Sequence, residues 1–140
     1  MKLLLFTLTL FLVQFTFGQK IYSKSQVDIQ PTFSACNNRI DADCFSKKLI
    51  NELVKELTDF YTTSPKGNYK AIINFTINEN GKFSDYKFSG NKKLGEKSIA
   101  ALKKMTSKIE ANKTKVIPAK LKGKAVKMSY SLPVNIMVDA

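Results

Sequence analysis

The chain has 140 residues, a length that suits one small domain, and 23 basic against 11 acidic side chains give it a formal net charge of +12. It contains no histidine, so acid–base catalysis near neutral pH would require a lysine, aspartate or glutamate with a shifted pKa. A single arginine, Arg39, is present. Because base and phosphate recognition relies most on arginine, nucleic acid is not expected as a partner.

The N-terminus has the pattern of a secretory signal peptide. Lys2 is followed by an apolar run over residues 3–13, and a small residue, Gly18, comes shortly after it. A membrane-spanning helix needs roughly 20 apolar residues, and this run is shorter, although an uncleaved anchor is the alternative interpretation. We expect cleavage after Gly18, which removes 18 of the 140 residues and leaves 122 in the periplasm or outside the cell.

The only two cysteines, Cys36 and Cys44, follow this leader. Export places them in an oxidising compartment, so we predict a disulfide that closes a short loop and stabilises the fold by about 2 to 3 kcal/mol at most. A redox or metal-binding role is the alternative, but the chain has neither histidine nor a CxxC spacing. No metal and no cofactor are expected.

Hydrophobic periodicity predicts the first helix and the first strand. Apolar residues recur every four positions over residues 45–57, with Asp43 as a plausible cap, which is typical of an amphipathic helix. A loop is expected over residues 62–67. Strict alternation over residues 69–77 then predicts a strand with one buried face.

The second half continues with a hairpin and a second helix. Asn80 and Gly81 favour a tight turn into a returning strand over residues 83–88. Helical spacing returns over residues 94–105, and residues 111–123 have no period and are expected to form a loop. A final strand is predicted over residues 126–138, where Pro133 indicates an edge strand or a bulge because proline has no N–H.

These elements predict an α+β domain of the order α-β-β-α-β. We expect a three-stranded antiparallel sheet with two helices packed on one face. The predicted organisation is a signal peptide over residues 1–18, an extended lead-in over residues 19–30 and one domain over residues 31–140.

The positive charge is regional. Residues 21–81 carry seven basic and seven acidic side chains, whereas residues 82–127 carry fourteen lysines against three carboxylates. Such a field favours acidic partners such as anionic lipid headgroups or polysaccharide, although a solvated lysine face is the more common explanation. The candidate anion-binding lysines are Lys103, Lys104, Lys108, Lys113, Lys115, Lys120, Lys122 and Lys124.

Several segments, taken in order, resemble the TonB C-terminal domain family. They are residues 31–36, 44–45, 73–82, 99–102, 118–126 and 130–134. The resemblance extends from Pro31 to Val138 and implies a domain that captures a short extended segment of an outer-membrane receptor by adding it as a strand. The chain lacks the family's proline-rich linker, so the resemblance implies a stand-alone member.

The leading hypothesis is therefore a periplasmic or secreted protein-binding module that uses the edge of the final strand. Its partner would be an outer-membrane TonB-dependent receptor or another envelope protein. The candidate contact residues are Val126, Lys127, Met128, Ser129, Tyr130, Ser131 and Asn135. Two alternatives are that this strand belongs to a closed sheet or forms a homodimer seam, so the protein is expected to be a monomer or a homodimer. A third is a lysine-driven binder of anionic envelope lipid or polysaccharide.

Catalysis is not expected, and no catalytic residue is assigned. No base is evident for a nucleophilic serine, and both cysteines are better used in a disulfide. Two carboxylate pairs, Asp41 with Asp43 and Glu52 with Glu56, are more simply explained as solvated loop and helix residues. The glycines are isolated and form no phosphate-binding loop.

Overall fold

The computed structural model describes residues 20–36, 42–111 and 115–139. The predicted signal peptide and its cleavage point lie outside these ranges. None of the helices within them is long and apolar enough to cross a membrane. The elements are, in chain order, η1 (Lys24–Gln26), β1 (Thr32–Phe33), α1 (Ala42–Glu56), α2 (Thr58–Thr63), β2 (Gly67–Ile77), β3 (Phe83–Gly90), α3 (Lys92–Ala111), β4 (Val116–Ile117), β5 (Lys120–Leu121), β6 (Lys124–Ala125) and β7 (Met128–Val138).

The main sheet has three antiparallel strands in the order β3-β2-β7. The central strand β2 pairs along its whole length with β7, from Gly67 opposite Val138 to Ile77 opposite Met128, without a register shift. Its pairing with β3 contains a bulge, next to which Asp85 adopts a φ of 54°. The predicted α+β class and the three-stranded antiparallel sheet are confirmed.

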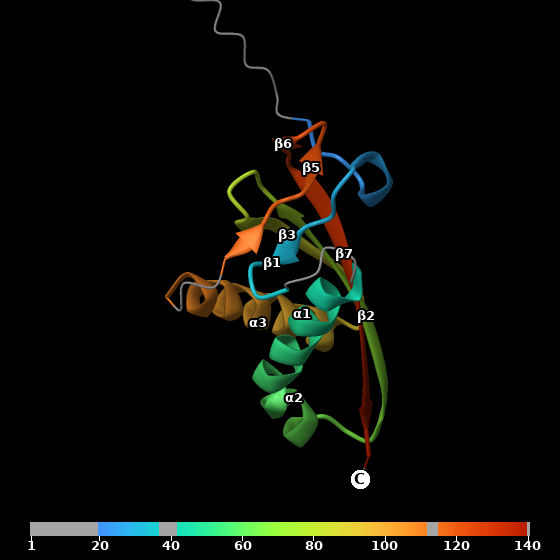
Figure 1. Ribbon diagram of the computed structural model, residues 1–140. Coiled ribbons are helices and arrows are strands. Elements are labelled where there is room, and N and C mark those ends of the chain that lie inside the picture. Colours follow the sequence, from blue (N-terminus) through green and yellow to red (C-terminus); the bar gives the residue numbers. More distant parts are fainter. Residues whose placement is uncertain (1–19, 37–41, 112–114, 140) are drawn as a thin grey trace, which may run out of the picture.

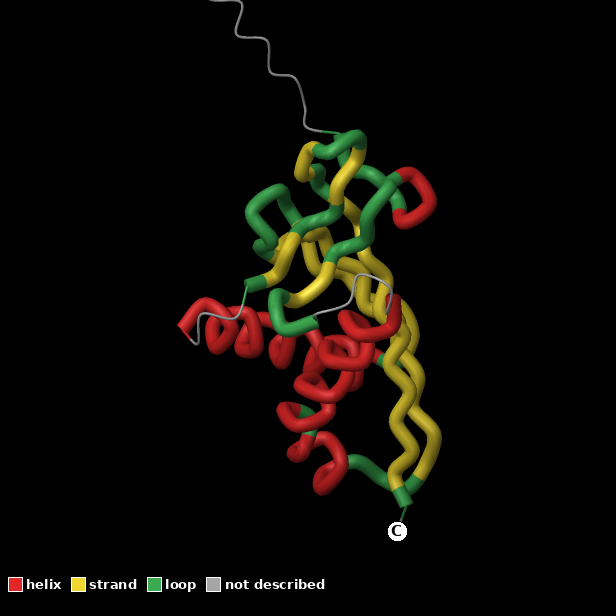
Figure 2. Tube along the Cα trace, viewed as in Figure 1, coloured by secondary structure: helices red, strands yellow, loops and turns green. Residues whose placement is uncertain are grey.

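Helices cover one face of this sheet and leave the other face open (Figures 1 and 2). Alternate residues of β2 and β7 point towards α1 and α3, as period-two patterning requires. On the open face, Ile72 is 46% exposed and Met137 is 62% exposed. The core residues of the four elements are Phe45, Leu49, Leu53, Ala71, Ile73, Phe75, Ile77, Leu94, Ala101, Leu102, Met105, Met128, Leu132, Val134, Ile136 and Val138.

Aromatic rings join the first helix to the sheet. The ring of Phe75, on the central strand β2, lies 4.7 Å from the Phe83 ring and 5.4 Å from the Tyr130 ring, measured between centroids. Phe45 of α1 meets Tyr130 edge-on at 5.3 Å and also packs on Phe33 of β1 at 4.8 Å. Three of these pairs are tilted and one is edge-on, so none is a face-to-face sandwich, the less favourable arrangement, and the cluster fixes α1 against the sheet.

The predicted disulfide between Cys36 and Cys44 is present. It links the turn after β1 to the first turn of α1, across a sequence separation of eight residues. A loop this short limits the entropic contribution to about 2 to 3 kcal/mol. The bond therefore holds the entry of α1 beside β1, where Phe33 and Phe45 pack.

A second short helix, α2, follows α1 directly and overlaps the start of the loop expected over residues 62–67. The chain turns at Leu57, whose N–H donates to the carbonyls of both Leu53 and Val54 at 3.1 Å. This turn places Phe60, which is fully buried, edge-on against the Tyr69 ring at 5.1 Å. Burial of Phe60 explains why helical structure extends to Thr63, past the predicted start of the loop at Thr62.

The expected loop over residues 111–123 is also more ordered than predicted. The helix α3 itself extends to Ala111, β4 pairs with β1, and β5 pairs with β6 in a hairpin. Lys122 and Gly123 at its tip have φ of 50° and 78°, the positive values that a two-residue hairpin turn demands. Strands of two residues carry no readable period, which is why the sequence does not reveal them.

Candidate functional site

The sheet has two edge strands, β3 and β7, and at β7 a contact from the N-terminal part of the chain shows which backbone groups face away from the sheet. The Tyr22 N–H donates to the Lys127 carbonyl at 2.9 Å, and the Ser129 N–H donates to the Tyr22 carbonyl at 2.8 Å. Lys127 and Ser129 thus present backbone groups to the side away from β2, which we call the outer edge of β7. Residues in an antiparallel strand alternate in the side to which they bond, so the odd-numbered residues face outwards.

Pro133 belongs to this outward set. Its missing N–H therefore removes no hydrogen bond between β7 and β2, and the strand pairing passes through Ile72 opposite Pro133 without interruption. The prediction that Pro133 marks an edge strand is confirmed by the strand order. Along the outer edge, proline instead interrupts the row of donors between Ser131 and Asn135.

Apart from Lys127 at its start, the outer edge carries no charge. From Met128 to Val138 the strand has no ionisable side chain other than that of Tyr130. Natural edge strands are commonly protected by charged side chains, by proline, or by a covering segment. In the part of the chain that the structure describes, Pro133 and the contact from Tyr22 are the two such devices on β7.

The predicted contact residues divide between two sides. Lys127, Ser129, Ser131 and Asn135 are in the outward set. Even-numbered Met128 and Tyr130 bond to β2, and their side chains point into the core, where Met128 is fully buried. The Val126 N–H is taken by the Ala119 carbonyl at 2.9 Å. Of the predicted contact residues, only those of the outward set can therefore present backbone groups to a ligand on the outer edge.

The N-terminal arm, residues 20–30, is the described part of the lead-in predicted over residues 19–30, and it is attached to the domain at two places. Its first attachment is Tyr22 on β7. Its second is on β5, where the Lys120 N–H donates to the Ile29 carbonyl at 3.0 Å and the Lys122 N–H donates to the Asp28 carboxylate at 2.7 Å. Figure 1 shows the arm in blue beside β5 and the first residues of β7. Each attachment involves only one or two residues of the arm, so no sequence pattern predicts it.

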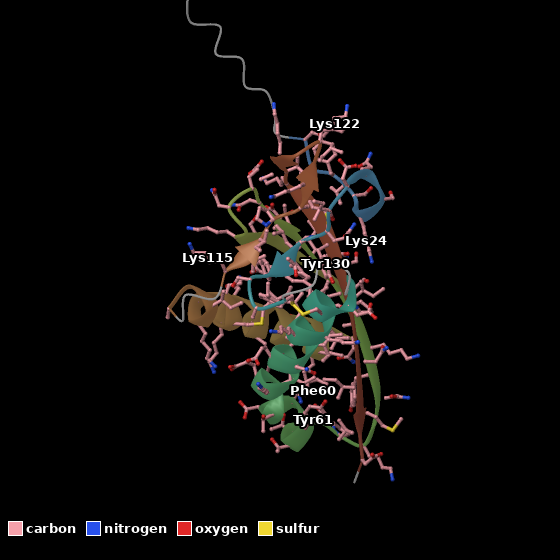
Figure 3. The ribbon with its side chains drawn as sticks, viewed as in Figure 1. Lys24, Phe60, Tyr61, Lys115, Lys122 and Tyr130 are labelled. Carbon is pink, nitrogen blue, oxygen red and sulfur yellow. A yellow bond between two sulfur atoms is a disulfide. The ribbon has the colours of Figure 1, made fainter. Side chains whose placement is uncertain are left out.

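The candidate anion-binding lysines do not form one surface. Lys103, Lys104 and Lys108 lie on α3, whereas Lys120, Lys122 and Lys124 lie on the β5–β6 hairpin. In Figure 3, Lys115 lies near the end of α3 and Lys122 at the far tip of the hairpin. Lys113 lies outside the described residues.

Two of the α3 lysines are engaged by a carboxylate. Glu56, at the end of α1, accepts a hydrogen bond from Lys104 at 2.6 Å and another from Lys108. Its side chain is 14% exposed. The hydrogen bonds from Lys104 and Lys108 lower the pKa of Glu56 below its usual value, and the same pairing raises the pKa of Lys104. This cluster joins α1 to α3 and leaves less positive charge free on that face.

We expect the Glu56 cluster to give the fold an acid-sensitive component. A carboxyl whose pKa is lower in the folded chain stabilises the fold above its unfolded-state pKa and loses that contribution as the pH falls through the folded-state pKa. Urea unfolding at a series of pH values from about 6 to 3 should show a steeper loss of stability in the parent than in Glu56→Gln. Glu52→Gln, which removes only the exposed pair with Lys55, is the control and should behave like the parent.

Other features offer less chemistry. Burial raises the pKa of Tyr86 and of Tyr130, away from neutrality, so both hydroxyls stay protonated. A cavity of about 650 Å³ opens between α1 and α3, with Phe33, Val54 and Met105 among its apolar lining residues. The Glu56 and Lys108 side chains on its wall already satisfy each other. Within the described residues, no group of three or more His, Cys, Asp or Glu side chains could hold a metal ion.

Comparison with known proteins adds no assignment: no family model matches the chain, and neither curated proteins nor solved structures match it significantly. The candidate site therefore rests on the geometry of the chain itself.

Proposed function

We propose that this protein is a periplasmic or secreted binding module that captures an extended peptide by strand addition at the outer edge of β7. The observation that carries the proposal is the outward-facing backbone of Ser129 and Ser131. The Ser129 carbonyl and the Ser131 N–H and carbonyl have no strand beside them in the described parts of the chain. Main-chain bonds to such an edge give affinity for any extended peptide, and alternating side chains give specificity.

The neighbouring side chains favour a polar, uncharged contact surface. Ser129 and Ser131 are exposed on the open sheet face, next to the outer edge, whereas Asn135 is exposed on the same face beyond Pro133, outside the stretch that the peptide would pair with. The Ser131 hydroxyl donates to the Asn74 amide oxygen of β2, which holds that side chain in place. Around the start of the edge the charge is positive, with Lys127, Lys124 and Lys24 close in the chain to Met128 or to Tyr22. A peptide with acidic residues before its paired segment suits these surroundings.

The resemblance to the TonB C-terminal domain family supports the same mode of binding. It suggests an outer-membrane receptor as the source of the peptide and a link to energy-dependent transport across that membrane. The Cys36–Cys44 disulfide and the leader-like N-terminus favour the periplasm or the extracellular space as the location.

The test is a titration followed by two-dimensional NMR at physiological salt. The probe is a synthetic peptide of about ten residues from an extended segment of an outer-membrane receptor of the source cell. Strand addition predicts that the amide signals of Ser129 and Ser131 shift most, with little change in α1 or α3. If the shifts are confined to the lysines of the β5–β6 hairpin and vanish when salt is raised, the peptide proposal is wrong and the anionic-surface alternative gains support.

A further inference from the structure

We propose that the first part of the N-terminal arm, residues 20–26, is a built-in competitor for the outer edge of β7. The captured peptide then binds in the position and direction of Tyr22, parallel to β7, and only after the arm detaches. This inference rests on the proposed strand addition, but the arm contact can be tested without any ligand.

The direction follows from the two hydrogen bonds of Tyr22. Tyr22 forms a parallel bridge with Met128. Its N–H donates to the carbonyl of Lys127, before Met128, and its carbonyl accepts from the N–H of Ser129, after Met128. This is the bonding pattern of one residue in a parallel pair of strands. The arm therefore shows that the edge accepts a parallel strand, and it fixes the register.

The arm uses only part of the available edge. After Tyr22 the chain turns away, because Ser23 and Gln26 bond to each other: the Ser23 N–H donates to the Gln26 side chain at 2.9 Å and the Gln26 N–H donates to the Ser23 carbonyl at 3.1 Å. The Ser129 carbonyl and both backbone groups of Ser131 remain open. A peptide that stays extended in the same register reaches these groups and ends where Pro133 offers no N–H, so it makes more backbone bonds than the arm.

The arm is held in a way that permits release. Residues 20–26 contribute nothing to the buried core, and Ile21 is 48% exposed. The next attachment, at Asp28 and Ile29 on β5, lies beyond Val27, so residues 20–26 can leave without disturbing it. Release costs the two backbone hydrogen bonds of Tyr22, the bond from the Gln30 side-chain amide to the Lys24 carbonyl and little apolar burial, which places the arm at the low-stability end of the molecule.

A covered edge also explains how the uncharged β7 avoids pairing with other chains. Pro133 interrupts the outer edge in the middle, and Tyr22 covers the beginning of the part before it. The arm thus blocks the start of the stretch from Lys127 to Ser131, at the Lys127 carbonyl and the Ser129 N–H, and keeps a partner from pairing along its whole length. Uncovering this stretch makes it available to one extended partner.

The test compares Tyr22→Pro with Tyr22→Ala in protein produced from Gln19 to Ala140, the chain expected after cleavage. Both variants lose the tyrosine ring, but only proline loses the N–H that donates to Lys127. Without ligand, we expect the Ser129 amide to exchange with solvent at least about tenfold faster in Tyr22→Pro, and at nearly the parent rate in Tyr22→Ala. A chain that begins at Val27 is a second variant and should match Tyr22→Pro.

The same proteins are then titrated with the receptor-segment peptide. Competition predicts an affinity about three- to tenfold higher for Tyr22→Pro than for Tyr22→Ala. The reason is that the arm of Tyr22→Pro no longer occupies the edge, so every molecule is free to bind the peptide. Equal exchange of Ser129 in all variants would show that the arm does not cover the edge and would overturn this inference, while peptide shifts at Ser131 would still support strand addition. Faster exchange with unchanged affinity would also overturn the competition. Faster exchange with no peptide binding by any variant would instead refute the proposed function.

Discussion

Replacing Phe75 by alanine is expected to lower the free energy of unfolding by about 3 to 5 kcal/mol, the usual cost of removing a buried phenylalanine ring. Phe75 is 1% exposed and lies on the central strand of the sheet. Its ring packs against those of Phe83, Tyr86 and Tyr130, with centroid distances of 4.7, 6.0 and 5.4 Å. Because these neighbours lie on the two flanking strands, β3 and β7, they cannot close the resulting cavity without moving the sheet, so the loss should fall near the upper end.

Urea denaturation followed by circular dichroism measures this change. Small domains are stable by only about 5 to 15 kcal/mol, so the variant should be close to unfolding at moderate temperature. Ile72→Ala is the matched control, because it removes apolar carbons from the same strand on the open face, where Ile72 is 46% exposed. Its cost should stay below about 1 kcal/mol. A similar cost for the two variants would mean that the open face is covered and that the sheet is not one-sided.

The long elements could be predicted because each repeats its pattern several times. In β7, side chains that point into the core alternate without a break with side chains on the open face of the sheet. From Met128 to Val138 all the core-facing side chains are buried except that of Tyr130, which is half-buried. In α1, Phe45, Leu49 and Leu53 recur at a spacing of four and define one face, which Leu57 continues just past the end of the helix. Where the pattern has only one or two repeats, as in α2 and β4, it carries too little information, and burial of Phe60 or pairing with the distant β1 decides the structure.

The candidate site was only partly predictable. Pro133 identified β7 as an edge, and it also contains an unused signal: a proline within a paired strand must point its missing N–H outwards. That fact selects Ser129 and Ser131 over Met128 and Tyr130 from the sequence alone. The Tyr22 contact and the Glu56 cluster join residues far apart in the chain by a few hydrogen bonds, so neither leaves a local pattern.

Replacing Ser131 by proline is expected to abolish most peptide binding while leaving the fold intact. Ser131 faces outwards, so its N–H is available to a ligand and is not used by β2; proline removes that donor and adds a ring to the outer edge. The affinity for the receptor-segment peptide should fall by at least about tenfold, which corresponds to roughly 1.4 kcal/mol. The unfolding free energy should fall by only about 1 kcal/mol, mainly through loss of the bond from the Ser131 hydroxyl to Asn74.

Asn135→Pro is the informative control, because it places the same ring on the same edge but beyond Pro133. A peptide paired in the register of Tyr22 ends before Asn135, so this variant should bind with the parent affinity. Both affinities can be measured by titration calorimetry, with unchanged sheet signals in circular dichroism as evidence of folding. If Asn135→Pro weakens binding and Ser131→Pro does not, the ligand lies on the C-terminal half of β7, and the arm cannot be its competitor. If neither variant changes the affinity for the peptide, the outer edge of β7 is not the binding surface, and the lysines of the β5–β6 hairpin are the next candidate surface to test.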